Sequence, residues 1–499
     1  MAANALANLE ATALTSRSHN PFFRREQLKS LHDTLRREIN SIRAAIRQDQ
    51  NVTDAEATIE VATALRHLTE HYAQIDPKAE LEREYRTTKA KSATDRTQPW
   101  GVVYIEPNLG HTPFLNVIEP LGAAVAAGSC VALKLENTRR ALPSLLRSLL
   151  PKALQPDVFH IIATSPSEEA SANLLSVLEN TRVGRPSYSQ LVSSCGSVIA
   201  VVDRTADLSS AAEALVAARF SFGGSSPYAP DLVLVNEFVE RDFIEQVLRY
   251  AIRYLVTTTP NGSLNSTSQP KERTTTAALA TLAENKDWQT DIITQGSTGA
   301  VIKLTNSYTT HVPLPPKSGA SVLAISAVSS LDHAIDLIAN NSNDRLSAAY
   351  HFAAPAHTKY LSQFIRSEVT FVNHIPPSLL LGPAAPVSHE VSVENRFRKE
   401  HFLRASPVLV RRSGTKGPTY TTGKYAEKLL EDAAQEIKEP KRAEWIAIGF
   451  FEQGILIGLG VGVEKVCGDM IAFLLLHDPA PDSFCLLATY NAKHSVARE

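Results

Sequence analysis

The sequence has few of the residues that build disulfide frameworks or metal clusters. Its 499 residues include only four cysteines, which are Cys130, Cys195, Cys467 and Cys485. None of them has the short paired spacing of a zinc site, and four are too few to staple a chain of this length. We therefore expect a reducing compartment and no bound metal.

The chain also lacks a dominant charge and a secretion signal. Its formal net charge is −2 with 20% charged residues, a balance that does not favour nucleic-acid binding. The first 20 residues have no cationic start followed by a long apolar core, so we expect a cytoplasmic protein. A single core stops growing at about 250 to 300 residues. The chain is therefore predicted to form two or more domains.

A strand, helix, strand pattern is present near residue 100. Residues 102–105 form an apolar run between proline and glycine residues, 115–127 carry apolar residues at helical spacing, and 131–134 form a second apolar run. Two buried strands joined by a helix predict a parallel βαβ unit, whose ligand site lies at the carboxyl ends of the strands. His111 and Lys134 fall at such ends.

This segment resembles the aldehyde dehydrogenase superfamily, in particular its fatty-aldehyde branch. The motif P-W-G-V-V at 99–103, Pro113-Phe114, A-A-G at 126–128 and Leu133-Lys134 match in order and spacing. The match extends from about Phe22 to about Leu409. It implies an α/β fold with a Rossmann-type dinucleotide-binding domain, an α/β catalytic domain and a C-terminal extension, in a homodimer that uses NAD or NADP.

The resemblance also predicts how the chain is divided. We expect N-terminal helices that pack on the cofactor domain (1–98), then the Rossmann-like domain (99–203) and the catalytic domain (204–390). A return segment for oligomerisation (391–417) and the extension (418–499) follow.

The cofactor positions implied by the family are only partly kept. Residues 179–184 line up with the family turn G-[ST]-T-x-V-G, and Thr181, Gly184 and the ribose-contacting Lys134 match. Glu179 replaces the first glycine with bulk and a negative charge. At ~4 Å and an effective dielectric near 20, its repulsion of one phosphate charge is on the order of 4 kcal/mol before screening. Lys317 stands where the family has the glutamate that binds the nicotinamide ribose, so we expect NAD or NADP binding in the usual pose to be disfavoured.

The catalytic positions implied by the family are changed as well. Ser193 stands at the general base, and a serine hydroxyl is not basic near pH 7. Pro227 stands at the cysteine nucleophile, in a register set by Ala229-Pro230-Asp231. Proline has neither a thiolate nor the backbone N–H that helps to hold the oxyanion. His111 replaces the asparagine that donates to the oxyanion, and an imidazole can still donate a hydrogen bond.

Other residues are candidates for a displaced chemistry. Cys195 lies on a loop that lines the catalytic chamber in the family, and a free cysteine there is either a nucleophile or a small buried hydrophobe. Ser225 and Ser226 precede Pro227, but the sequence shows no base near them. His111 is a candidate acid or base.

The last part of the chain leaves the family pattern. Residues 425–439 predict a charged helix, and 445–463 are apolar apart from Glu452 and Gln453. A membrane span needs about 20 apolar residues, and a central acidic residue costs about 3 kcal/mol on insertion scales. The stretch is either a membrane-association segment or an appended core segment that covers the protein or a partner.

Two functions remain open from the sequence. In the first, the protein has lost the nucleophile and base of the family and is a repurposed or accessory protein, by analogy in a secondary-metabolite pathway. It then binds, or acts without oxidation on, a small hydrophobic molecule or aldehyde. In the second, it is an NAD(P)-dependent aldehyde dehydrogenase that forms a carboxylic acid by a non-standard site, through Cys195 or an aldehyde hydrate.

Overall fold

The computed structural model describes residues 2–50, 52–179, 186–193, 196–255, 270–306, 312–339, 345–411 and 423–437. The chain divides into two units, Met1–Arg412 and Ser413–Glu499. In the second unit, helix α14 (Gly423–Ala433) agrees with the charged helix expected from residue 425. The apolar stretch 445–463 lies outside the described residues, as do Cys195, Thr181 and Gly184. None of the helices in the described segments combines the length and apolar composition that a bilayer span requires.

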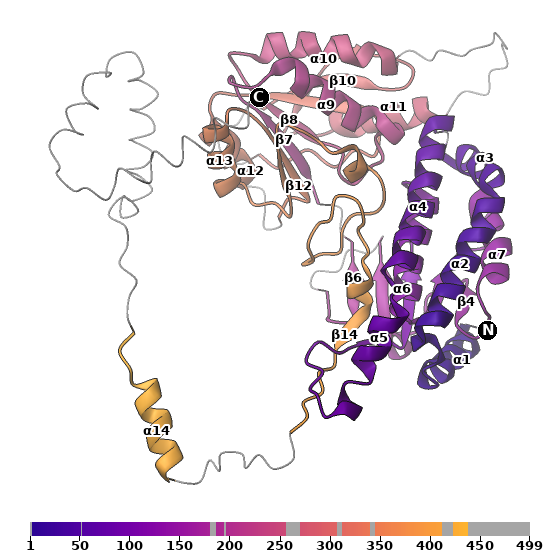
Figure 1. Cartoon of the computed structure of the whole chain (residues 1–499). Helices are drawn as coiled ribbons and strands as arrows, with labels where there is room; N and C mark the ends of the chain where they lie inside the picture. Colours follow the sequence, from indigo (N-terminus) through magenta and orange to yellow (C-terminus); the bar gives the residue numbers. More distant parts are fainter. Residues whose placement is uncertain are drawn as a thin grey trace, which may run out of the picture. The chain divides into compact units, whose positions relative to one another are not determined.

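A parallel sheet forms around the pattern near residue 100 (Figure 1). Its strands are, in spatial order, β4 (Phe159–Ile162), β3 (Cys130–Lys134), β2 (Val102–Glu106), β5 (Leu175–Leu178) and β6 (Gln190–Val192). Strand β2 pairs in parallel with β3 and β5, and helix α6 (Pro113–Ala127) joins β2 to β3. The predicted βαβ unit is confirmed.

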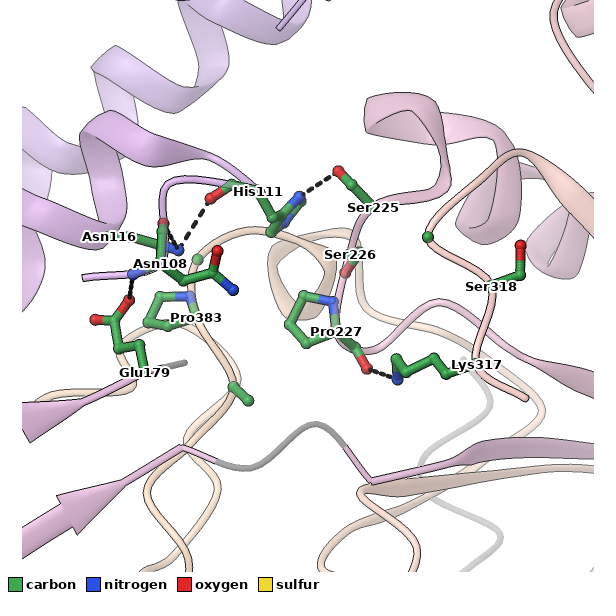
Figure 2. A pocket seen from close by; sticks show the side chains of 13 residues that line it. Asn108, His111, Asn116, Glu179, Ser225, Ser226, Pro227, Lys317, Ser318 and Pro383 are labelled. Carbon is green, nitrogen blue, oxygen red and sulfur yellow. Dashed lines mark hydrogen bonds between the residues drawn. The ribbon is translucent and has the colours of Figure 1, made fainter. Parts of the chain in front are cut away.

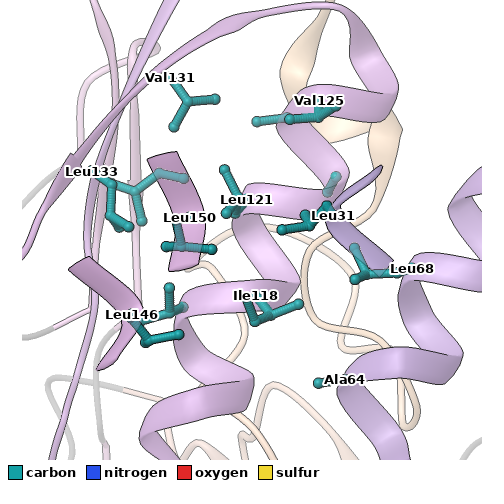
Figure 3. Packing of buried hydrophobic residues seen from close by; sticks show 14 of the residues in the cluster. Leu31, Ala64, Leu68, Ile118, Leu121, Val125, Val131, Leu133, Leu146 and Leu150 are labelled. Carbon is teal, nitrogen blue, oxygen red and sulfur yellow. The ribbon is translucent and has the colours of Figure 1, made fainter. Parts of the chain in front are cut away.

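Successive side chains of β2 and β3 point to opposite faces of this sheet, and each face has its own helical cover. One face packs into a core that includes Leu31, Leu68, Ile118, Leu121 and Leu146 (Figure 3). The helices that supply this core are α2 (Pro21–Arg37), α3 (Ile39–Gln50), α4 (Asp54–Gln74), α6 and α7 (Ala141–Ala153). The opposite face packs against Leu6 and Leu9 of α1 (Ala2–Leu14). The expected N-terminal helical region is therefore present.

A larger mixed sheet follows in the chain. Its order is β13 (Thr370–Val372), β12 (Ala348–Phe352), β7 (Val198–Val202), β8 (Leu232–Asn236), β11 (Val322–Val328), β10 (Ala300–Thr305) and β9 (Gln289–Gln295). All neighbours are parallel except β9 and β10. Strand β7 lies in the expected Rossmann-like segment 99–203, yet it pairs with β8 and β12 of this second sheet.

Helices cover both faces of the second sheet. Helices α9 (Leu208–Phe220) and α10 (Glu240–Leu255) supply one core, and the other core receives α11 (Pro270–Ala283), α12 (Leu331–Ala339) and α13 (Pro355–Phe364). Helix α11 begins at Pro270. Proline suits the first turn of a helix because it has no N–H to leave unpaired there.

Short elements connect these layers. The antiparallel pair β1 (Thr97–Pro99) and β14 (Leu403–Ala405) brings the segment near residue 400 back beside the start of β2. Helices α5 (Pro77–Glu84) and α8 (Glu168–Ser171) are short. The 3-10 turns are η1 (Arg17–His19), η2 (Thr87–Lys89), η3 (Ser221–Gly224), η4 (Pro377–Leu380) and η5 (Lys399–Phe402).

Candidate ligand pocket

A pocket of about 250 Å³ lies where loops from both sheets meet (Figure 2). It is lined by the loop between β2 and α6, the residue that follows β5, the turn before β8, and the segments 317–319 and 382–384. Its side chains include His111, Glu179, Ser225, Ser226, Pro227 and Lys317. The structure therefore brings together six of the residues singled out from the sequence, which are His111, Glu179, Ser225, Ser226, Pro227 and Lys317.

The loop that carries His111 is held in a strained conformation. Thr112, at the start of α6, has φ 33 and ψ 61 and is buried, a left-handed geometry that is uncommon for a residue with a Cβ. The Asn116 amide donates to the backbone carbonyls of Asn108 and His111, both at 2.9 Å. Glu60 of α4 accepts from the N–H groups of Phe114 and Leu115 at the same helix start. These contacts hold the loop and so position the imidazole.

Both ring nitrogens of His111 are engaged. The Nε2 atom lies 2.9 Å from the Leu380 carbonyl oxygen, and Nδ1 lies 2.9 Å from Ser225 Oγ. Burial lowers the pKa of His111 to about 4, so the ring is neutral at pH 7. A carbonyl accepts only, so the ring proton is on Nε2, and Nδ1 accepts from the Ser225 hydroxyl. The N–H expected to serve an oxyanion therefore already donates to Leu380.

The turn that carries Ser225 is also strained. Phe222, Gly223 and Gly224 have φ values of 51, 64 and 74, and Glu56 of α4 accepts from the Phe222 N–H at 2.6 Å. A Cβ on Gly224 would clash with the backbone carbonyl of Ala320. The Phe222 ring contacts His111 edge to face, with centroids 5.7 Å apart. The structure places the imidazole of His111 beside Ser225. The sequence does not reveal this neighbour, because the two residues are far apart in the chain.

Ser225 and Ser226 also make local contacts. The Ser225 hydroxyl lies 2.8 Å from the Phe222 carbonyl oxygen, which competes with His111 for its single proton. Ser226 is buried, and its Oγ accepts from the Tyr228 N–H at 3.3 Å. Contacts of this kind are typical of loop serines that satisfy backbone groups.

Lys317 fixes the wall of the pocket at Pro227. Its ammonium group donates to the carbonyl oxygens of Pro227 at 2.7 Å and Gly196 at 3.0 Å, and lies 3.4 Å from Asp231 Oδ2. Figure 2 shows this side chain reaching toward Pro227. The charge of Lys317 is therefore paired inside the protein.

The carboxyl group of Glu179 is buried in the wall of the pocket. The residue is 3% exposed, and its Oε2 accepts from the Asn108 N–H at 2.7 Å. Its Oε1 has no hydrogen-bond partner among the described residues. Burial and the neighbouring Glu119 hold the pKa of Glu179 well above its usual value. Burial therefore disfavours the negative charge expected from the sequence, which weakens the charge repulsion toward phosphate, while the bulk of the side chain remains.

The remaining predicted site residues lie elsewhere. Lys134 Nζ bonds Glu106 Oε1 and Ser165 Oγ, both at 3.1 Å. Ser193 is buried, its N–H donates to the Leu178 carbonyl, and its hydroxyl has no partner among the described residues. Neither residue lines the pocket. In the described part of the chain, no group of three or more His, Cys, Asp or Glu side chains is placed to hold a metal ion.

The chain is similar in sequence to known aldehyde dehydrogenases. A model of the aldehyde dehydrogenase family matches residues 2–379. The chain is 26% identical over 270 residues to aldehyde dehydrogenase family 3 member B1 of Rattus norvegicus, covering 50% of this chain and 56% of that protein. It is 25% identical over 272 residues to 4,4'-diaponeurosporen-aldehyde dehydrogenase of Staphylococcus aureus (strain NCTC 8325 / PS 47), covering 46% and 53%. The dimeric NADP-preferring aldehyde dehydrogenase of Rattus norvegicus is 23% identical over 246 residues, covering 45% and 53%. The chain thus spans about half the length of the curated relatives it matches.

Solved structures share the fold. The substrate-bound state of Staphylococcus aureus AldH has a TM-score of 0.66 at 17% identity and covers 87% of this chain and 99% of its own. NADP-dependent glyceraldehyde-3-phosphate dehydrogenase from Bacillus halodurans C-125 complexed with NADP has a TM-score of 0.61 at 15% identity and covers 81% and 90%. At these identities the likeness shows the fold alone, and this fold is the α/β architecture that the sequence predicts.

Proposed function

This chain belongs to the aldehyde dehydrogenase family, and from that premise we propose that it binds a small, uncharged carbonyl compound in the pocket beside His111 without oxidising it. The observation that carries the proposal is Pro227. It lines the pocket, and the sequence register assigns it to the position of the family nucleophile, where it offers neither a thiolate nor an N–H. A bound carbonyl group would therefore meet no attacking sulfur from this position.

The rest of the pocket supports binding without covalent oxidation. Ser193, at the position of the family base, does not line the pocket. His111 is neutral and held by Leu380 and Ser225, so it accepts a hydrogen bond but is a weak base near pH 7. The charge of Lys317 is paired with Asp231. The pocket accordingly favours a ligand with polar atoms but no net charge.

The described residues fit a dinucleotide poorly in the usual pose. Glu179 fills the position of the glycine that lets the backbone approach a pyrophosphate. Lys134, which would hold a ribose, is paired with Glu106. We derive no chemical step through NAD or NADP. We also propose a homodimer and an accessory role in a secondary-metabolite pathway, and the similarity to a relative named as a dimeric aldehyde dehydrogenase supports the homodimer.

The second candidate is an NAD(P)-dependent aldehyde dehydrogenase that uses Cys195. Family membership and the relatives named as aldehyde dehydrogenases favour it. In this reading Thr181 and Gly184, with Lys134, would hold the dinucleotide, and Cys195 would supply the thiolate that Pro227 lacks.

One experiment separates the two functions. The purified full chain is mixed with benzaldehyde or decanal and with NAD+ or NADP+, and both the melting temperature and the absorbance of reduced cofactor are followed. We expect an aldehyde to raise the melting temperature and no cofactor to be reduced. Steady cofactor reduction that is abolished in Cys195→Ala and kept in Ser225→Ala would favour the oxidoreductase instead.

A further inference from the structure

Glu179 lines the pocket with a carboxyl group that is only half satisfied. One oxygen accepts from the Asn108 N–H, and the other has no partner among the described residues although the side chain is 3% exposed. A buried polar atom without a partner costs about 1 to 3 kcal/mol. Such groups are rare in folded proteins, and each one needs a physical reason. A ligand that completes the hydrogen bond is a reason of this kind.

The location of the Glu179 proton follows from its contacts. The nearby cations are paired elsewhere, Lys134 with Glu106 and Lys317 with Asp231. Burial and the carboxyl group of Glu119, which is also buried, both disfavour ionisation of Glu179. Because Oε2 already accepts from an N–H, the proton is on Oε1. In its protonated form Glu179 therefore presents to the pocket an O–H group that has no acceptor in the described part of the protein.

We propose that Glu179 is a ligand-binding residue that donates its Oε1–H to the carbonyl oxygen of an uncharged aldehyde or ketone held in this pocket, an inference that rests on the proposed function. The hydrogen bond fixes the carbonyl end of the ligand. A buried carboxylic acid kept neutral so that it can donate a hydrogen bond to an oxygen is an established device in enzyme sites.

The surroundings of Glu179 select against charged ligands. A carboxylate or phosphate would enter a pocket that contains one buried acid and lies beside another, Glu119. The Lys317 ammonium group, which would have to compensate that charge, already serves Asp231, Pro227 and Gly196. At about 250 Å³ the pocket is slightly smaller than a typical ligand site of about 300 Å³ or more. The carbonyl end of the ligand is therefore compact.

The experiment compares probes that share one ring and differ in one group. Dissociation constants are measured for benzaldehyde, toluene and benzoate by ligand-observed NMR with the full chain. The variants are Glu179→Gln, which keeps an N–H donor, and Glu179→Leu, which keeps the volume but has no donor. Glu368→Gln is the matched control, because burial also raises the pKa of Glu368 but this residue does not line the pocket.

We expect the wild-type protein to bind benzaldehyde at least tenfold more tightly than toluene, and benzoate more weakly than either. Glu179→Leu should bring benzaldehyde and toluene within about threefold of each other, whereas Glu179→Gln and the control should keep most of the preference. The benzaldehyde affinity of the wild type should fall as Glu179 ionises at high pH, and that of Glu179→Gln should stay flat.

The outcomes separate this inference from the proposed function. Equal binding of benzaldehyde and toluene, an unchanged preference in Glu179→Leu, or tight binding of benzoate would overturn the role of Glu179, while the pocket would remain a binding site. If no probe binds to a wild-type protein with native circular dichroism, the proposed function fails, and the role of Glu179 is overturned with it.

Discussion

The core under α6 and the pocket at its start differ in polarity and in backbone strain. In the core, Leu68, Ile118 and Leu121 are at most 1% exposed and pack on one another (Figure 3). In the pocket, Thr112 and Phe222 have left-handed backbones, and one oxygen of Glu179 has no hydrogen-bond partner among the described residues. Strain and unsatisfied polar groups persist where the surrounding fold over-determines them, and they concentrate at functional sites. The difference indicates that the core supplies the stability and the pocket supplies the chemistry.

Two adjacent glycines offer the strongest way to break this comparison. Gly223 and Gly224 both have positive φ, but a Cβ on Gly224 would clash with the Ala320 backbone, whereas a Cβ on Gly223 has nothing within 4 Å. We expect Gly224→Ala to lower the free energy of unfolding by about 4 kcal/mol, and Gly223→Ala by about 1 kcal/mol from the backbone alone. Urea unfolding measures both. Equal effects would mean that the turn is not packed as described.

Truncation in the core should affect stability and leave binding intact. Leu121 is fully buried in α6, so Leu121→Ala should lower the free energy of unfolding by about 3 kcal/mol. The affinity for benzaldehyde should stay within about twofold of wild type at a temperature where the variant is folded. Leu14→Ala is the control, because Leu14 is 87% exposed and its truncation should change stability by less than about 0.5 kcal/mol. A loss of affinity in Leu121→Ala would show that core and pocket are coupled.

In contrast to truncation of the core, substitution of Glu179 is expected to raise the free energy of unfolding at high pH. Its folded-state pKa is raised above the ordinary 4.5 by burial and by Glu119. The folded state therefore holds its proton longer than the unfolded state, and this residue lowers stability increasingly as pH rises from about 4.5 toward the folded pKa. Glu179→Gln removes that slope, so it should be more stable than wild type by about 2 kcal/mol at pH 8, with a smaller difference at pH 5.

Thermal unfolding of the wild type and of Glu179→Gln between pH 5 and pH 8 checks the sign of this stability difference. Glu60, whose pKa burial raises to about 7, is present in both proteins, so its contribution cancels in the comparison. A Glu179→Gln variant that is less stable than wild type at pH 8 would indicate an ionised, well-paired carboxylate at this position.

The smallest effect is expected at Ser225. Ser225→Ala removes the hydroxyl that lies between His111 and the Phe222 carbonyl, and should lower the free energy of unfolding by about 1 kcal/mol. Ser226→Ala is the matched control. The wild-type protein should resist labelling by a fluorophosphonate. Labelling at Ser225 that depends on His111 would instead identify a nucleophile and base pair.

The fold was largely predictable because it depends on local patterns. Two apolar runs and a segment with helical spacing in residues 102–134 predict the βαβ unit, and the structure contains it as β2, α6 and β3. Strand β7 lies in the segment 99–203 that is expected to form the Rossmann-like domain, but its place in the second sheet depends on pairing with β12, about 150 residues later in the chain. No local pattern encodes that partner.

The sequence identified several residues that line the pocket, but not their contacts or their ionisation. The family register identifies Pro227 and Lys317, and both line the pocket. It cannot reveal that His111 meets Ser225, since 114 residues separate them. It also assigns Glu179 a charge, because ionisation depends on burial that only the folded chain defines.

The most direct measurement is the carbon-13 NMR spectrum of benzaldehyde, labelled at its carbonyl carbon and bound to the wild-type protein. A ligand held without covalent attack keeps a trigonal carbonyl carbon, and a hydrogen bond from Glu179 draws electron density from it. We predict a bound signal in the aldehyde region, shifted downfield from free benzaldehyde, with the shift lost in Glu179→Leu. A signal of a tetrahedral carbon that disappears in Cys195→Ala or Ser225→Ala would contradict the proposed non-covalent pocket.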